Sequence, residues 1–172
     1  HRENTGGEQK IVIQKGDKNM NFIEGEIANL SARGITEETC RKWDYRVGSV
    51  AGQPVQVANY KDSSGTRIAQ KIRFKNKDFH VRGDIKEAGL YGEHLWSGKG
   101  KKAIVCEGEI DALSVSQSQG NRWPVYSIPN GSAGASKAIR KSIELLNGYD
   151  EVIFCFDSDE PGIKASRECA QV

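Results

Sequence analysis

The sequence predicts an α/β protein in which a parallel sheet flanked by helices follows a smaller α+β unit that carries a basic β-hairpin. In the second half of the chain, short apolar runs at 104–106, 124–128 and 151–156 are each followed by a segment with helical spacing. Strands that alternate with helices form parallel sheets, and they are continuously apolar because helices cover both faces. In the first half, runs at 54–60 and 66–74 flank a polar turn, which is typical of a hairpin.

The first apolar run of the parallel sheet ends abruptly in acidic residues. Glu107 follows this run directly, and Gly108 permits a sharp exit from the strand. From Asp111 onward the apolar residues recur at helical spacing. Open α/β sheets bind ligands at the carboxyl ends of their strands, so Glu107 is a candidate functional residue.

The last apolar run also ends in acids, at Asp157 and Asp159. Residues two apart in an extended chain point the same way, so both carboxylates are expected to face one point. If the strand before Glu107 is the neighbour, three carboxylates come together. An oxygen-only set of this kind suits Mg²⁺ or Mn²⁺ rather than zinc.

Acidic residues after strands can also have a purely structural role, because they cap the helices that follow. Pro161 fits the first turn of a helix expected over 163–172, so Asp159 is a candidate N-cap. Asp111 and Glu109 equally suit a helix N-terminus, where negative charge is favourable. For these acids the sequence leaves both interpretations open.

Composition bounds the class of protein and its division into units. The chain has 172 residues and a formal net charge of +2, and no apolar run approaches the ~20 residues of a membrane span. We expect a linker or tail over 1–19, with a short strand at 11–13, a nucleic-acid- or nucleotide-binding unit over 20–98, and the parallel sheet over 99–172. The start at His1 rather than Met indicates a fragment or a processed product.

The four cysteines form no C-x-x-C pair, which argues against a zinc ribbon within this chain. Cys106 and Cys155 lie inside predicted strands, so we interpret them as small buried hydrophobic residues. All four are expected to be free thiols in a reducing environment.

The hairpin region is strongly basic. Its candidate phosphate-contacting residues are Lys71, Arg73, Lys77, His80 and Arg82. A charged solvent-exposed face is the alternative, and it has about equal weight. On either interpretation the lysines are expected to be exposed, so their replacement should cost little stability.

Two helices complete the prediction. Thr36 is a candidate N-cap for a helix over 37–43, which has acids in its first turn and bases in its last. A single helix is expected over 136–146, with its lysines on the outer face of the molecule.

Several motifs resemble a known family. Glu107-Gly108-Glu109-Ile110-Asp111, the glycine loop 129–135, Asp157-Ser158-Asp159 and the Gly162-x-Lys164-Ala165 run are similar to the TOPRIM fold of topoisomerases and primases. Upstream blocks at 30–36, 70–73, 77–79 and 90–96 resemble the primase half of bifunctional phage primase-helicases, relatives of the mitochondrial Twinkle helicase. The acidic motifs alone indicate TOPRIM, and the upstream blocks make the resemblance more specific.

The resemblance implies a DNA primase, a nucleotidyltransferase that makes short RNA primers from NTPs on a single-stranded DNA template. It implies that Glu107 is catalytic and that Glu107, Asp157 and Asp159 hold Mg²⁺ or Mn²⁺. It places Lys71 and Lys77 in the nucleotide- and DNA-binding surface, while His80 stands where relatives are expected to carry lysine. It also implies a phage protein that works in the host cytoplasm.

Two departures from the family pattern bear on the expected partners. The family's N-terminal zinc ribbon is absent from this chain, and the sheet normally continues beyond Val172 with another strand and another acid. The TOPRIM unit is therefore expected to be truncated and the isolated fragment to be weakly active or inactive. A helicase domain and a zinc-binding domain are expected in the full-length protein.

Two rival functions remain open from the sequence. A metal-dependent TOPRIM nuclease would use the same carboxylates with water as nucleophile. A non-catalytic fragment that binds DNA or replication partners is the second rival. Template-dependent NTP incorporation, compared with nicking in the absence of NTPs, separates the first rival from a primase.

Overall fold

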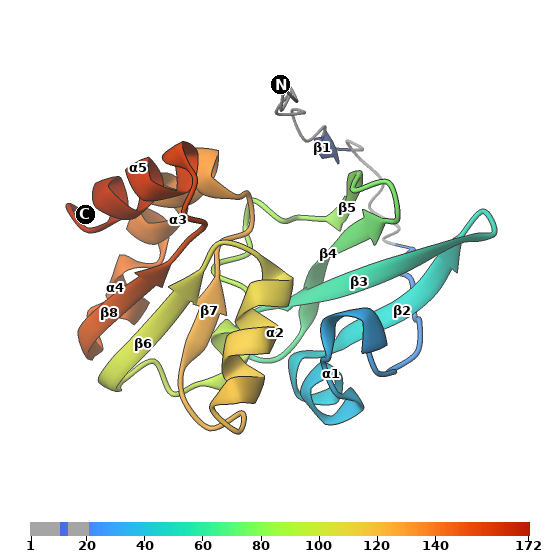
Figure 1. Ribbon diagram of the computed structural model, residues 1–172, viewed down its shortest axis with the longest axis horizontal. Helices are drawn as coiled ribbons and strands as arrows, with labels where there is room; N and C mark the ends of the chain where they lie inside the picture. Colours follow the sequence, from blue (N-terminus) through green and yellow to red (C-terminus); the bar gives the residue numbers. More distant parts are fainter. Residues whose placement is uncertain (1–10, 14–20) are drawn as a thin grey trace, which may run out of the picture.

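The computed structural model describes residues 11–13 and 21–172 of the chain, so most of the expected linker over 1–19 lies outside the described residues. These residues form two sheets that lie side by side (Figure 1). The first sheet has the order β1-β5-β4-β3-β2 and is antiparallel, except that β1 pairs in parallel with β5. Its strands are β1 (Ile11–Ile13), β2 (Tyr45–Val50), β3 (Gln53–Lys61), β4 (Arg67–Phe74) and β5 (Phe79–Gly83).

The second sheet is parallel, as the sequence predicts. Its order is β7-β6-β8, so β6 lies between its two partners. The strands are β6 (Gly100–Cys106), β7 (Val125–Ser127) and β8 (Tyr149–Cys155). The helices between and after them are α2 (Glu109–Ser118), α3 (Ala135–Lys141), α4 (Ile143–Leu146) and α5 (Glu160–Cys169).

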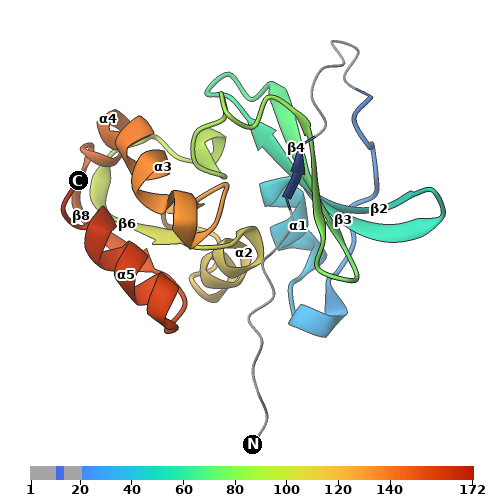
Figure 2. The same cartoon turned by 90° about the horizontal axis from the view of Figure 1, so that it is seen from above.

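The helices cover opposite faces of this sheet. Helix α2 lies between the two sheets, whereas α3 and α5 lie on the far side (Figure 2). One core therefore forms between the parallel sheet and α3, α4 and α5. A second core joins the two units, because Tyr60 of β3 and Trp43 of α1 (Glu37–Trp43) pack in the same cluster as Leu113 of α2 and Val125 of β7.

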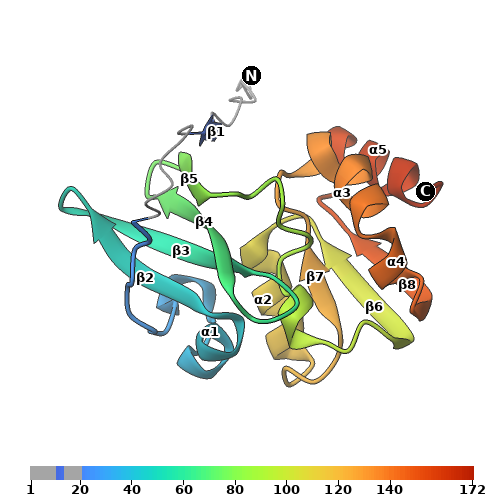
Figure 3. The same cartoon turned by 180° about the vertical axis from the view of Figure 1, so that it is seen from behind.

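The segment between β5 and β6 runs between the two sheets (Figure 3). It contributes Ile85, Ala88 and Tyr91 to the joint core, and Tyr91 exchanges backbone hydrogen bonds with Ser127 of β7. It also contains the short 3₁₀ helix η2 (Glu93–Leu95). The predicted boundary between the two units near residue 98 stays a prediction, since the joint core contains residues from both sides of it, such as Tyr91 and Cys106.

Local sequence signals account for the helix ends. The Thr36 hydroxyl accepts a hydrogen bond from the Thr39 amide at 3.3 Å, which caps α1 as the sequence predicts. Helix α5 begins after Asp159, whose carboxylate accepts from the Gly162 amide, and Pro161 occupies its first turn. Gly162 is required there, because a Cβ would lie 2.2 Å from the Asp157 carbonyl oxygen.

The structure corrects three expectations. Strand β2 follows α1 directly and was not predicted, because its Gly48 and Ser49 interrupt the apolar pattern. The expected helix over 136–146 is two helices, α3 and α4, which meet at Ser142. Cys155 is exposed rather than buried, because β8 is an edge strand among the described residues and α2 packs against β7 and β6.

The strand at 11–13 is confirmed as β1. Short 3₁₀ helices η1 (Ser31–Arg33) and η3 (Ser132–Gly134) precede α1 and α3. Within the described part of the chain, no helix combines the length and the apolar character that a membrane crossing requires.

Candidate functional site

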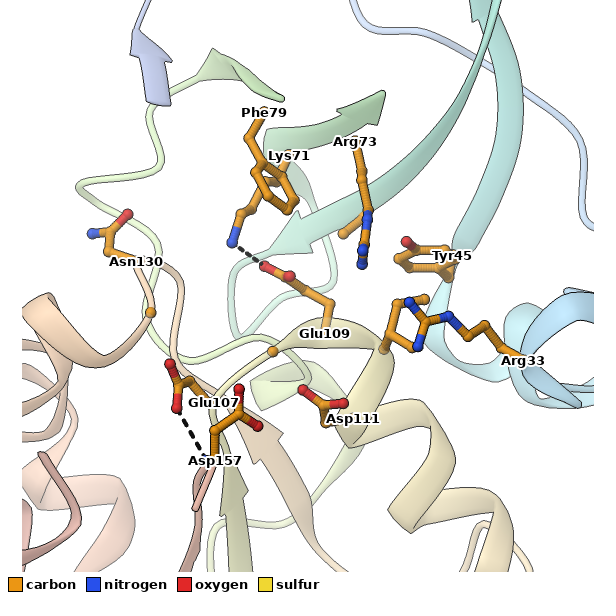
Figure 4. A pocket seen from close by; sticks show the side chains of 14 residues that line it. Arg33, Tyr45, Lys71, Arg73, Phe79, Glu107, Glu109, Asp111, Asn130 and Asp157 are labelled. Atoms are coloured by element: carbon orange, nitrogen blue, oxygen red, sulfur yellow. Dashed lines mark hydrogen bonds and ion pairs between the residues drawn. The ribbon is translucent and has the colours of Figure 1, made fainter. Parts of the chain in front are cut away.

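A cavity of about 370 Å³ opens between the two units, above the carboxyl ends of β6 and β8 (Figure 4). The parallel-sheet unit contributes the acidic side chains of this pocket, and the first unit contributes the basic ones. The acids are Glu107, Glu109, Asp111 and Asp157, and the bases are Arg33, Lys71 and Arg73.

Glu107 holds three strand ends together. One carboxylate oxygen accepts a hydrogen bond from the Ser132 amide, in the loop after β7, at 3.2 Å. The other accepts from the Asp157 amide, after β8, also at 3.2 Å. Glu107 itself directly follows β6, so its charge lies where the sequence predicts, at the carboxyl edge of the sheet.

Asp111 and Asp157 bring further negative charge to this edge. Desolvation raises the pKa of Asp111, and the Asp157 carboxylate raises it further because two like charges disfavour ionisation. The Asp111 carboxylate also approaches the backbone closely, since a Cβ on Gly108 would lie 2.7 Å from its Oδ2 atom. Gly108 itself has an extended backbone, with φ of −122°, that any residue adopts, so its missing side chain matters for this approach and not for the turn.

The donor chemistry of Glu107, Asp111 and Asp157 fits a divalent cation such as Mg²⁺, because every available ligand is a carboxylate oxygen. Opposite charge would also relieve the repulsion that raises the pKa of Asp111. As the side chains stand, no three His, Cys, Asp or Glu residues among those described form a ready-made metal site. The carboxylates share the pocket without a preassembled coordination sphere.

Asp159 is separated from this group. Its Oδ1 accepts from the Gly162 amide at 2.9 Å as the N-cap of α5, and it does not line the pocket. The structural alternative that the sequence left open is thus realised for Asp159. A metal-binding role for this residue stays a prediction.

Glu109 faces the first unit rather than the other acids. Its side chain is 9% exposed, and its Oε1 lies 2.9 Å from Nζ of Lys71, whose side chain is 10% exposed. The Tyr60 hydroxyl donates to the same oxygen at 2.6 Å. Lys71 Nζ also donates to the Pro129 carbonyl at 2.9 Å. The lysine that sequence reasoning expected to be exposed is therefore a largely enclosed partner of Glu109.

Arg73 and Arg33 supply the remaining positive charge. Neither guanidinium forms an ion pair with any acid in the described residues, and both line the pocket. The Phe79 ring lies 4.9 Å from Lys71 Nζ and 5.7 Å from Arg73 Cζ. Sequence reasoning did not select Arg33. In the sequence, its only signal is its place in the block 30–36, which resembles primases. In the structure, it directly precedes Gly34, whose φ is 64°.

The other predicted basic residues lie elsewhere. On β4 and β5, Arg73 is paired with Phe79 on the pocket face, whereas His80 is paired with Ile72 and Arg82 with Gln70 on the opposite face. His80 packs against Phe74, and Arg82 donates to the Asn21 carbonyl. Lys77 is exposed in the turn between the strands, outside the pocket lining.

Comparisons with known proteins agree with this arrangement. Residues 25–83 match the family described as the N-terminal α+β fold of the bacteriophage T7 DNA helicase/primase, and residues 104–172 match the Toprim-like family. The DNA helicase/primase of Enterobacteria phage T3 is 41% identical over 174 residues, which cover 99% of this chain and 30% of that protein. The chain thus spans less than a third of that relative.

Solved structures give the same result. The primase fragment of the bacteriophage T7 primase-helicase is 39% identical with a TM-score of 0.83, covering 99% of this chain and 69% of that one. The T7 primase domains in a complex with lagging-strand DNA polymerase are 42% identical with a TM-score of 0.82, covering 87% and 76%. The Escherichia coli primase catalytic core is 15% identical with a TM-score of 0.61. The match covers 80% of this chain and 56% of that one, and it shows that the two share the fold. The chain therefore belongs to the family of primase domains of bacteriophage primase-helicases.

Proposed function

We propose that this domain makes short RNA primers from NTPs on single-stranded DNA. The observation that carries the proposal is the pocket itself, in which carboxylates at the ends of parallel strands face cations from a second unit. Phosphoryl transfer needs this combination, because negative charge on the phosphates must be neutralised while the attacking and leaving oxygens are positioned.

Glu107, Asp111 and Asp157 are the residues that we propose to hold divalent metal, with Mg²⁺ or Mn²⁺ as the ion. A bound cation would supply charge neutralisation at the transferred phosphate. Glu107 is in addition the proposed proton acceptor for the attacking 3′-hydroxyl, because its carboxylate stands at the centre of the strand ends.

Arg33 and Arg73 are proposed to bind phosphates of the nucleotide or the template. Both are cations that face the pocket and have no acidic partner in the described residues. Arginine suits this task because its planar group contacts phosphate oxygens in pairs. Lys77, His80 and Arg82 lie outside this pocket, so any contact that they make would be with nucleic acid further along its path.

The wider setting of the domain is also a proposal. The phage T3 relative is a helicase/primase, and the T7 primase domains have a solved structure with an RNA/DNA hybrid, dTTP and a polymerase. The structure of the Aquifex aeolicus primase includes a zinc-binding domain. We propose that this domain works beside a helicase domain and a zinc-binding domain, in the cytoplasm of a phage host.

The test is Glu107→Gln, measured as NTP incorporation on single-stranded DNA. Loss of the charged group should lower primer synthesis by about a hundredfold or more. Glu144→Gln is the matched control, because Glu144 is exposed on α4 away from the pocket. Circular dichroism must show both variants folded. Unchanged synthesis by Glu107→Gln at saturating Mg²⁺ would exclude the proposed role of Glu107. DNA nicking by the parent protein without NTPs would instead favour a nuclease.

A further inference from the structure

The contact between Glu109 and Lys71 joins the two units inside the pocket (Figure 4). Glu109 is the first residue of α2, in the parallel-sheet unit, whereas Lys71 lies on β4 of the first unit. Tyr60, on the neighbouring strand β3, donates to the same carboxylate oxygen that Lys71 contacts. A carboxylate, an ammonium and a phenol from three elements thus form one buried cluster.

The charged groups of this cluster face the cavity as well as each other, whereas an ordinary ion pair at an interface only joins its two sides. Both charged side chains line the cavity that also contains Arg33 and Arg73. An ammonium has three donors, and Lys71 directs two of them to Glu109 and to the Pro129 carbonyl. One donor remains for a group inside the cavity, and the Phe79 ring flanks the nitrogen on another side.

We propose that Glu109 is a positioning residue that fixes the ammonium of Lys71 for the phosphates of an incoming nucleoside triphosphate, and that Tyr60 in turn fixes Glu109. The inference rests on the proposed primase function. It assigns a task to the second acid of the Glu107-Gly108-Glu109 motif, which is distinct from metal binding.

Two physical arguments support this role. Lysine is flexible, and a free side chain loses rotamer entropy when it is immobilised, so a partner that holds it in advance favours ligand binding. Tyr60 is a dependable donor, because burial and the Glu109 carboxylate raise its pKa well above the usual value and keep the hydroxyl protonated. The protonated hydroxyl is therefore available as a donor to Glu109.

The competing explanation is that the cluster only holds the two units together. The variant Tyr60→Phe separates the two roles, because it removes one hydroxyl and leaves the ion pair in place. Tyr91→Phe is the matched control. Tyr91 is equally buried, its ring packs against Tyr60 at 5.0 Å, and its hydroxyl donates to the Trp43 carbonyl instead.

Primer synthesis is then measured for each variant over a range of NTP concentrations. Tyr60→Phe should raise KM for NTP by about tenfold with little change in kcat, as expected when a hydrogen bond to a charged group is lost and nucleotide binding weakens uniformly. Tyr91→Phe should leave KM unchanged, whatever it does to the melting temperature. Equal KM values for the two variants would overturn the inference.

An exchange of the two charges gives a second, independent readout. The double variant Lys71→Glu and Glu109→Lys keeps an ion pair between β4 and α2 and moves the ammonium to the other unit. If Glu109 serves Lys71 as proposed, this variant should recover the melting temperature lost in Lys71→Glu but not nucleotide affinity, measured by titration with fluorescently labelled ATP and Mg²⁺. Recovery of both would show that the pair is only a structural contact. If the exchanged protein does not fold, the KM comparison of the tyrosine variants decides.

These experiments distinguish failure of the inference from failure of the proposed function. Absence of template-dependent synthesis by the unaltered protein would refute the primase proposal. Normal synthesis with equal KM values for Tyr60→Phe and Tyr91→Phe would refute only the positioning role of Glu109.

Discussion

Replacement of Lys71 by methionine is the sharpest test of the buried contact between the units. Methionine has a similar length and no charge, so Lys71→Met leaves the Glu109 carboxylate without its cation. Both side chains are nearly enclosed, with 10% of Lys71 and 9% of Glu109 exposed, so water cannot fully replace the lost partner. The sequence alone predicts the opposite, a small effect typical of an exposed lysine.

The expected loss follows from this geometry. Removing one member of a buried ion pair destabilises a protein by about 3–5 kcal/mol. The Tyr60 hydroxyl still donates to Glu109 at 2.6 Å, so we expect the lower end, about 3 kcal/mol. In a protein of this size each kcal/mol lowers the melting temperature by about 2–4 °C, which gives a decrease of about 6–12 °C.

Urea and thermal denaturation followed by circular dichroism measure this effect. Lys77→Met is the control, because Lys77 is exposed in the turn after β4 and should change stability by less than about 0.5 kcal/mol. The double variant Lys71→Met and Glu109→Leu removes both charges and should regain most of the lost stability. If Lys71→Met and Lys77→Met have the same melting temperature, the contact between Lys71 and Glu109 does not stabilise the protein and the reasoning is wrong.

Two further predictions concern pH and thiols. The raised pKa of Asp111 means that its carboxylate destabilises the fold as the pH rises through that pKa, so Asp111→Asn should raise the urea midpoint at pH 7 in EDTA. The gain should vanish below the usual pKa of 3.8, and a constant gain at all pH values would contradict it. Ellman's reagent should modify exposed Cys155 first in native protein, because burial raises the pKa of Cys40 to about 11, and should find four thiols after denaturation. Rapid native reaction of Cys40 would argue against its burial.

Much of the fold follows from periodicity in the sequence. Apolar runs followed by helical spacing predict the parallel strands, and Thr36 and Asp159 mark the starts of helices correctly. The break at Ser142 has no such signal, because the apolar pattern continues across it. The Ser142 hydroxyl contacts Glu93 at 3.1 Å, a tertiary contact that local pattern cannot reveal.

The site was harder to predict than the fold. Glu107 and Asp157 lie in the pocket as expected, because strand ends determine their positions. The basic residues required a choice of strand face. The register that pairs Arg73 with Phe79 sends His80 and Arg82 to the other side, and that register is a property of the folded sheet. The sequence showed only that these basic residues are close together along the chain, so all of them were assigned to one surface.

The joint core has a consequence for how such a domain can work. Trp43, Tyr60 and Tyr91 are almost completely buried where the two units meet, in one cluster with Leu113 of α2. Swinging the units apart would expose these large side chains to water at a cost of several kcal/mol. The joint core therefore opposes a hinge motion that would separate the acidic and basic sides of the pocket. Under the proposed function, a nucleic-acid strand would bind in a gap whose two sides are joined by this core, with Arg33 and Arg73 lining it.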